Sequence, residues 1–171
     1  MSADASHHTR GNGQTQPAKH DLLRLLDDLA LLSSKELRLV FAGAQVPSSL
    51  AALDGDLAGR MLAARGLRPG RVFRALATLA KNSRFPWAGK TFTSEDAERG
   101  SGDNRVRLVG TRHAVPFTTR FGTSTVDGRP CIVLDYDFPL HDELREVSPG
   151  LFLGPACLRR HVVVWFGLQR S

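Results

Sequence analysis

The segment Arg159-Arg-His-Val-Val-Val-Trp-Phe-Gly-Leu168 closes a run of short apolar segments that begins at Val106. Apolar residues occupy both of its faces, so we expect residues 161–168 to form a β-strand that is covered on both sides. Five further segments with strand character precede it, at residues 105–109, 114–125, 130–138, 144–147 and 151–158. Antiparallel strands joined by short turns form small barrels or curved sheets, and a barrel can enclose a cavity.

Turn signals separate these segments. Asp127-Gly128 predicts a hairpin with a type I′ turn, in which both central residues have positive φ. Pro149-Gly150 suits a type II turn, and Arg159-Arg160 leaves room only for a tight reversal. Pro116 cannot donate a hydrogen bond to a neighbouring strand, so we expect it at a sheet edge or at a bulge.

Helical patterns come before the strands. Five leucines have the spacing of one helical face, namely Leu22, Leu25, Leu26, Leu29 and Leu32. Ser33-Ser-Lys-Glu36 matches a capping box, which predicts a second short helix that continues through Phe41 and ends at Gly43. The leucine face could pack against a barrel or form the seam of a homodimer.

The sequence thus divides into a disordered tail at residues 1–19, a helical segment at 20–52 and a barrel domain at 53–171. Within the barrel domain we expect a first strand at 57–63, a third helix at about 71–81 and a polar surface loop at 93–103. The expected fold class is therefore mainly β with N-terminal helices, an antiparallel barrel or half-barrel.

The composition narrows the function classes. The net charge of +6 comes from arginines scattered among Gly and Ala without interleaved aromatic residues, so we expect no nucleic-acid partner. No apolar stretch is long enough to span a membrane, and the N-terminus lacks the pattern of a secretory signal. A cytoplasmic location with Cys131 and Cys157 reduced is the expectation. No phosphate-binding loop, dinucleotide fingerprint or nucleophile elbow is present, and we expect no cofactor.

Two glycine-bearing motifs, Gly55-Asp-Leu-Ala-Gly59 and Trp87-Ala-Gly-Lys-Thr-Phe92, resemble those of the GXWXG family of small calycin-type proteins. In that family a G-x-W-x-G strand is followed by a W-x-G-K-x-F segment. The residues Asp127-Gly-Arg-Pro130, Leu134-Asp-Tyr136 and Leu153-Gly154 are similar to its companion domain. Leu57 stands where the family has its central tryptophan. The resemblance covers about residues 53–168 and implies a lipocalin-like barrel that holds a ligand, without naming a reaction.

Acidic residues gather between residues 135 and 146, where Asp135, Asp137 and Glu146 are our candidate catalytic groups. An aspartate that points into an apolar lumen would have a raised pKa and could act as a general acid or base. Arg145 could then orient a ligand carboxylate or enolate. Alternatively, Arg145 pairs with one of these acids and the others lie in water. No spacing matches a recognised set of metal ligands, so we expect no metal.

Further candidates would form the walls and anchors of a cavity. Trp87, Phe117 and Trp165 are candidate apolar walls, and Thr119 is a candidate polar anchor for a ligand. Lys90 could form a Schiff base if it were buried, although a lysine at the start of a strand more often extends to solvent. Alternation along residues 130–138 places Tyr136 on the apolar face and Asp135 on the opposite one.

We therefore expect this chain to bind a small, largely apolar organic molecule of the lipid, polyketide or terpenoid type. Two alternatives remain open. One is an isomerase, cyclase or lyase that acts in the same cavity without a cofactor. The other is a protein-interaction module with a filled barrel, assembled through Leu22, Leu25 and Leu29.

Overall fold

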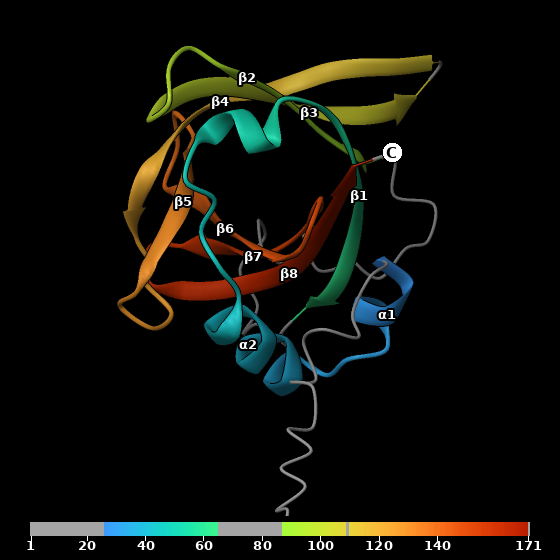
Figure 1. The fold of residues 1–171 in the computed structure, drawn as a ribbon. Coiled ribbons are helices and arrows are strands. Elements are labelled where there is room, and N and C mark those ends of the chain that lie inside the picture. Colours follow the sequence, from blue (N-terminus) through green and yellow to red (C-terminus); the bar gives the residue numbers. More distant parts are fainter. Residues whose placement is uncertain (1–25, 65–86, 109, 171) are drawn as a thin grey trace, which may run out of the picture.

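Eight antiparallel strands form a closed barrel in the computed structural model, which describes residues 26–64, 87–108 and 110–170. Each strand pairs with the next along the chain, and the last pairs with the first (Figure 1). The strands are β1 Gly55–Ala64, β2 Trp87–Ser94, β3 Arg99–Leu108, β4 Gly110–Thr123, β5 Pro130–Asp135, β6 Leu140–Ser148, β7 Leu151–Leu158 and β8 His161–Arg170. The expected lipocalin-like antiparallel barrel is confirmed, and the barrel closes within one chain.

Two α-helices and a 3₁₀ helix precede the barrel: α1 Leu26–Ala30, α2 Ser34–Gly43 and η2 Leu50–Leu53. The predicted capping box of α2 is present, since Ser33 Oγ accepts from the Glu36 N–H and Glu36 Oε2 accepts from the Ser33 N–H. The helix ends at Gly43, as predicted. The predicted tail at residues 1–19 and the predicted helix at 71–81 lie outside the described residues.

The predicted polar loop at residues 93–103 is wrong. Strand β2 continues to Ser94 and β3 begins at Arg99, so that Thr93 pairs with Ser101 across a short hairpin. The turn is stabilised by Asp96, whose Oδ1 accepts from the Glu98 and Arg99 N–H groups. Strand pairing with β4 stabilises a polar and glycine-rich segment that has little strand propensity of its own.

The turns lie where the sequence predicts them, but one of them has a conformation that differs from the predicted one. Gly150 has a φ of 75° between β6 and β7, and Arg159 has a φ of 55° in the reversal before β8. Gly128 has a φ of 73°, whereas Asp127 is not among the residues with positive φ, so the predicted type I′ turn is wrong. The connection is a longer loop, closed by a hydrogen bond from the Ser124 N–H to the Arg129 carbonyl.

The two faces of the barrel wall bury separate cores. Inside, Phe92, Leu134, Phe152 and Phe166 belong to one apolar cluster, and η2 adds Leu50 and Leu53 to it. Outside, α1 and α2 pack on the wall, with Phe41 of α2 edge-to-face on Trp165 at 5.7 Å between ring centroids. As expected, β8 is therefore covered on both sides. No helix in the described part of the chain is long and apolar enough to cross a membrane.

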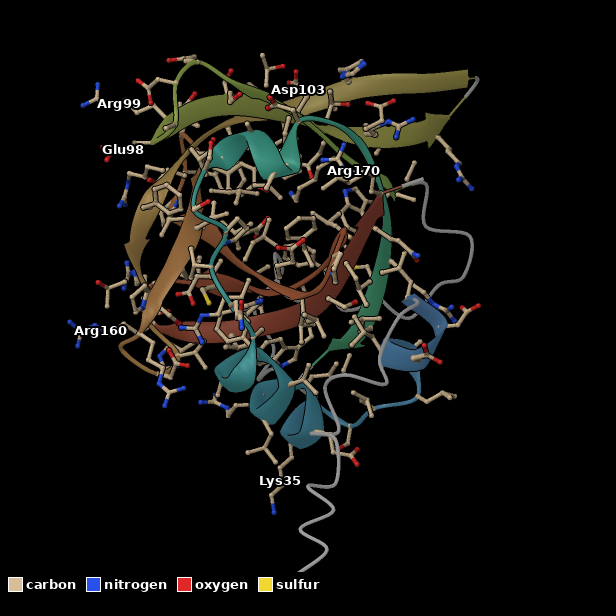
Figure 2. All side chains as sticks on the ribbon, in the orientation of Figure 1. Lys35, Glu98, Arg99, Asp103, Arg160 and Arg170 are labelled. Atoms are coloured by element: carbon tan, nitrogen blue, oxygen red, sulfur yellow. The ribbon has the colours of Figure 1, made fainter. Side chains whose placement is uncertain are left out.

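Charged side chains lie mainly around the outside of the barrel, as Figure 2 shows for Lys35, Glu98, Arg99 and Arg160. This arrangement leaves the interior to apolar groups. The exceptions are Lys90, Asp142, Glu143 and Arg145, whose side chains are buried. Of these four, Lys90 and Asp142 line a cavity inside the barrel and locate the candidate site.

Candidate functional site

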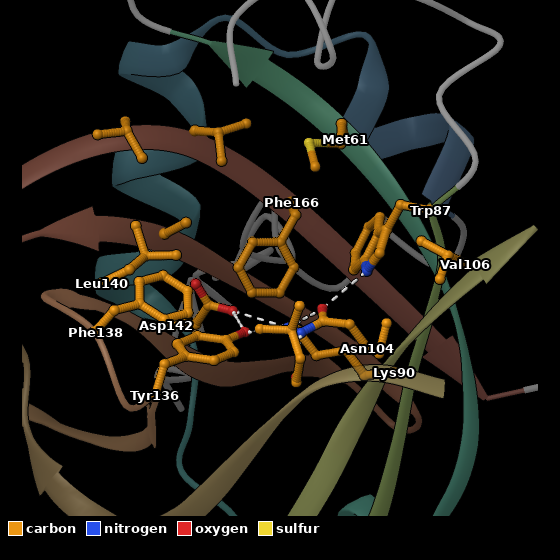
Figure 3. Close-up of a pocket in the computed structure, with 15 residues that line it drawn as sticks. Met61, Trp87, Lys90, Asn104, Val106, Tyr136, Phe138, Leu140, Asp142 and Phe166 are labelled. Atoms are coloured by element: carbon orange, nitrogen blue, oxygen red, sulfur yellow. Dashed lines mark hydrogen bonds and ion pairs between the residues drawn. The ribbon is translucent and has the colours of Figure 1, made fainter. Parts of the chain in front are cut away.

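A cavity of about 220 Å³ lies inside the barrel and is lined by residues from every strand except β5, together with the β5–β6 connection (Figure 3). Most of its lining is apolar and includes Met61, Val106, Val164 and Phe166. Its polar groups come from Lys90, Asn104, Tyr136 and Asp142 and from the indole N–H of Trp87. An apolar cavity with a few convergent polar groups is typical of a small-molecule site.

Lys90 is the central polar residue of this cavity and is only 2% exposed. Its Nζ lies 2.9 Å from Asp142 Oδ2, 2.7 Å from Asn104 Oδ1 and 2.6 Å from the Tyr136 hydroxyl oxygen. An ammonium group has three N–H donors, so these contacts account for all of them. The prediction that Lys90 extends to solvent is therefore wrong.

Aromatic rings surround the same ammonium group. Nζ lies 4.9 Å from the ring centroid of Phe117, 5.3 Å from Tyr136, 5.4 Å from Phe166 and 5.8 Å from Trp87. At these distances the π-electrons of the rings attract a cation. The rings and the carboxylate of Asp142 together replace part of the water that Lys90 loses on burial.

Tyr136 connects the charged partners. Its hydroxyl donates to Asp142 Oδ2 at 2.6 Å and accepts from Lys90 Nζ, with Asn104 Nδ2 a further donor at 3.3 Å. Asn104 in turn accepts from the Trp87 indole N–H at 3.0 Å. The remaining carboxylate oxygen, Asp142 Oδ1, is buried and has no hydrogen-bond partner in the described part of the protein.

Burial controls the ionisation of this network. It lowers the pKa of Lys90 below its ordinary value, and the charge and hydrogen bond of Asp142 counteract that effect. Burial also raises the pKa of Tyr136 well above its ordinary value, and the neighbouring Asp142 adds to the shift. The Tyr136 phenol therefore stays neutral at physiological pH and donates its proton to the carboxylate.

A strained residue holds Asn104 in place. Val115 has a φ of 58°, which is unfavourable for a β-branched residue, and it is the additional residue of a bulge opposite Asp103 and Asn104. Its carbonyl accepts from Asn104 Nδ2 at 3.1 Å. Pro116 follows directly, which confirms the expectation of a bulge. Val115 and Phe138 line the cavity and are half exposed, so they mark its mouth.

Glycines allow Trp87 to reach the cavity wall. A Cβ atom at Gly59 would lie 2.6 Å from the Trp87 ring, and one at Gly89 would lie 2.0 Å from the Leu57 carbonyl oxygen. Gly89 also has a φ of 131°. Gly59 and Gly89, one from each motif that resembles the GXWXG pattern, thus serve one purpose, the close approach of β2 and the Trp87 ring to β1.

Of the residues proposed from the sequence, Trp87 lines the cavity and Phe117 packs against Tyr136 at its edge. Thr119 is buried but is not among the residues that line the cavity. Asp135 and Asp137 border a different, more polar hollow, and Asp135 accepts a hydrogen bond from Arg120 at 2.8 Å. Asp137 is exposed, so neither of these aspartates lies in an apolar lumen.

The other three proposed residues lie away from the cavity lining. Arg145 is buried outside the lumen, where it forms a bidentate pair with Asp127 at 2.7 Å for both contacts and stacks on Phe41. Its Nη1 also donates to the Phe41 carbonyl. Trp165 packs on α2, and Glu146 accepts from the Gly150 N–H at 2.9 Å. Arg145 and Glu146 thus connect α2, the β4–β5 loop and the β6–β7 turn to the barrel.

A separate group of ionisable side chains, away from the cavity lining, lies on strands β6 and β7. The ligand-capable atoms of His141, Glu143 and Cys157 lie within 4.8 Å of one another. Glu143 Oε1 already accepts from the Thr125 N–H and hydroxyl at 2.6 Å each, and Oε2 accepts from the Ser124 hydroxyl. We therefore interpret this group as the hydrogen-bonded support of the β4–β5 loop.

Sequence reasoning placed Asp142 in the acidic cluster without selecting it, missed Asn104 and underrated Lys90 and Tyr136. Strand alternation offered a partial signal, because it placed Tyr136 on the apolar face of its strand. A hydroxyl or a charge on an apolar face requires a partner inside the barrel. The sequence could not identify that partner, since Asp142 lies on another strand among several similar carboxylates.

No protein-family model matches the chain, and no curated protein matches it. A solved structure described as "Crystal structure of protein from Thermomonospora curvata" is similar to it, with a TM-score of 0.58 and 16% sequence identity. The similarity covers 82% of this chain and 88% of that one. At this identity the comparison supports the fold alone.

Proposed function

We propose that this protein binds a small, largely apolar organic molecule in the cavity of its barrel. The observation that carries the proposal is the apolar lining around a buried, hydrogen-bonded pair of Lys90 and Asp142. Apolar walls provide affinity through the hydrophobic effect, and a few fixed polar groups orient the ligand.

The cavity volume narrows the ligand class. A protein cavity of ~150 Å³ holds one benzene molecule, so the 220 Å³ here suits about nine non-hydrogen atoms. A single-ring aromatic compound or a small terpenoid has this size. A long fatty acid would extend through the mouth between Val115 and Phe138, so we favour the smaller molecules.

A second candidate function is an isomerase, cyclase or lyase that needs no cofactor. The observation that favours it is the contact of a carboxylate, a phenol and an amine within one apolar cavity. Groups with such environments can hold and move a proton. On this hypothesis Asp142 takes the role that the sequence suggested for Asp135, Asp137 and Glu146.

The filled-barrel interaction module receives less support. The barrel contains a cavity, and Leu29 is fully buried against the chain's own barrel wall. Leu22 and Leu25 lie outside the described residues. A homodimer is still a prediction, and it would need a seam other than one formed by Leu29.

Native mass spectrometry of the purified protein tests the binding proposal. We expect a bound molecule of small mass that is released on denaturation, and its loss from Val164→Phe, which fills the cavity from β8. Val162→Phe is the matched control, because Val162 packs on the outer cluster of the same strand. A molecule retained equally by both variants would show that the cavity is not its binding site.

A further inference from the structure

We propose that the ligand carries a hydroxyl group that donates a hydrogen bond to Asp142 Oδ1, which makes it a small apolar alcohol or phenol. This inference rests on the proposed function and specifies the chemistry of its ligand. It follows from the distribution of hydrogen bonds around the cavity, where one acceptor is unpartnered while the donors are occupied.

Asp142 provides the unpartnered acceptor. The residue is 3% exposed and lines the cavity, with Oδ2 bonded to Tyr136 and Lys90. Oδ1 is buried without a partner in the described part of the chain. A buried carboxylate oxygen without a donor is unfavourable, so a ligand that brings a donor gains free energy there.

The other polar groups of the cavity are already paired. The three donors of Lys90 meet Asp142, Asn104 and Tyr136, and the Trp87 indole N–H meets Asn104. The Asn104 amide also donates to the Val115 carbonyl. A ligand carbonyl would therefore have to displace an existing bond, whereas a ligand hydroxyl finds an open acceptor.

Charge favours a neutral donor over a cationic one. The ammonium of Lys90 already occupies the space between the aromatic rings and neutralises Asp142. A second cation beside it would be repelled and would lose its hydration without gaining a free counter-charge. A hydroxyl group requires no such compensation.

Three probes of equal size test the inference on the full-length protein: 4-ethylphenol, 4-ethyltoluene and acetophenone. 4-Ethylphenol presents a hydroxyl donor, 4-ethyltoluene presents an apolar methyl group, and acetophenone presents a carbonyl acceptor without a donor. Isothermal titration calorimetry should show 4-ethylphenol binding roughly tenfold more tightly than 4-ethyltoluene, as expected for a hydrogen bond to a charged acceptor. Acetophenone should bind no more tightly than 4-ethyltoluene.

A double variant tests whether the preference for 4-ethylphenol over 4-ethyltoluene depends on Asp142. Lys90→Met with Asp142→Leu removes both charges together, and it should reduce the preference for the phenol to roughly twofold or less. The Asp142 Cγ chemical shift in the native protein supplies an independent readout that needs no variant. It should move on addition of 4-ethylphenol more than on addition of 4-ethyltoluene.

The outcomes separate the two proposals. Equal affinity for 4-ethylphenol and 4-ethyltoluene would overturn the hydroxyl inference and leave the apolar cavity proposal standing. A phenol preference that persists in the double variant, or an unmoved Asp142 signal, would also overturn it. Absence of binding by all three probes would refute the cavity proposal and this inference with it.

Discussion

Lys90 Nζ lies 2.9 Å from Asp142 Oδ2 inside the barrel, although the two residues lie on strands β2 and β6 that do not pair with each other. In the order of eight strands these two are opposite walls. The ion pair therefore spans the lumen, and the Tyr136 hydroxyl bonds to both partners. This bridge joins the two halves of the barrel and forms the polar end of the cavity (Figure 3).

Removal of one partner of this pair should be strongly destabilising. Lys90→Met or Asp142→Leu alone leaves an uncompensated buried charge and should lower the free energy of unfolding by about 3–5 kcal/mol. The double substitution should cost much less than the sum, because no charge is then left unpaired. Urea denaturation followed by circular dichroism measures all three values.

The pair of Arg120 and Asp135 is the matched control for that experiment. Their side chains are 53% and 41% exposed, so the charges keep most of their hydration. Arg120→Met should therefore cost about 1 kcal/mol or less. Additive losses at Lys90 and Asp142 would contradict the assignment of a coupled buried pair.

Acid should weaken the attachment of the β4–β5 loop. The hydrogen bonds from Arg145 hold the pKa of Asp127 below its ordinary value of 3.8. A carboxyl with a lower pKa in the folded state stabilises the protein above pH 3.8, and this contribution is lost as the pH falls through the folded-state pKa. The free energy of unfolding of Asp127→Asn should therefore lie below that of the native protein at pH 7, and the gap should narrow toward pH 2. A gap of equal size at both pH values would show that ionisation of Asp127 contributes nothing.

Both cysteines should resist thiol reagents in the folded protein. Cys131 and Cys157 are free and fully buried, and burial, with the charge of Glu143 adding to it, raises the pKa of each thiol to about 12. Thiolates are the reactive form, so Ellman's reagent at pH 8 should label neither residue until urea unfolds the chain. Rapid labelling of a thiol under native conditions would contradict this arrangement.

Gly89 should tolerate no side chain. A Cβ atom there would meet the Leu57 carbonyl oxygen at 2.0 Å, so Gly89→Ala must separate β1 from β2. We expect a loss of at least ~3 kcal/mol or failure to fold. Gly128→Ala is the control, because its Cβ would meet nothing within 4 Å and only the cost of a φ of 73° applies, about 1 kcal/mol. Similar losses in both variants would show that the close approach at Gly89 is unimportant.

Local sequence patterns predicted much of the fold. Continuous apolar segments bounded by turn signals identified the strands Leu151–Leu158 and His161–Arg170, because a strand that is covered on both sides carries apolar residues on both faces. The Ser33 capping box identified the start of α2 through contacts only three residues apart. These features are determined by residues that are close in the chain.

Strict alternation along β8 would place Val163 and Val164 on opposite faces of the strand, but a bulge interrupts it. Val163 and Val164 both line the cavity, because β8 shifts register against β7 near Cys157. The hairpin of residues 93–103 was missed for a related reason, since cross-strand pairing there outweighs weak local propensity. Both errors reflect interactions between strands, which a single segment does not encode.

By itself, the sequence determined the fold class, the positions of the turns and the wall residue Trp87, because each depends on local spacing, on glycine or on burial of apolar faces. Only the tertiary structure decided which charges lie inside. Asp135 and Asp142 look alike in the sequence, yet one pairs with Arg120 on an exposed face and the other with Lys90 in the lumen. Closing the barrel brings side chains from opposite strands to within hydrogen-bond distance, and that closure selects Asp142, Tyr136 and Lys90 as the candidate site.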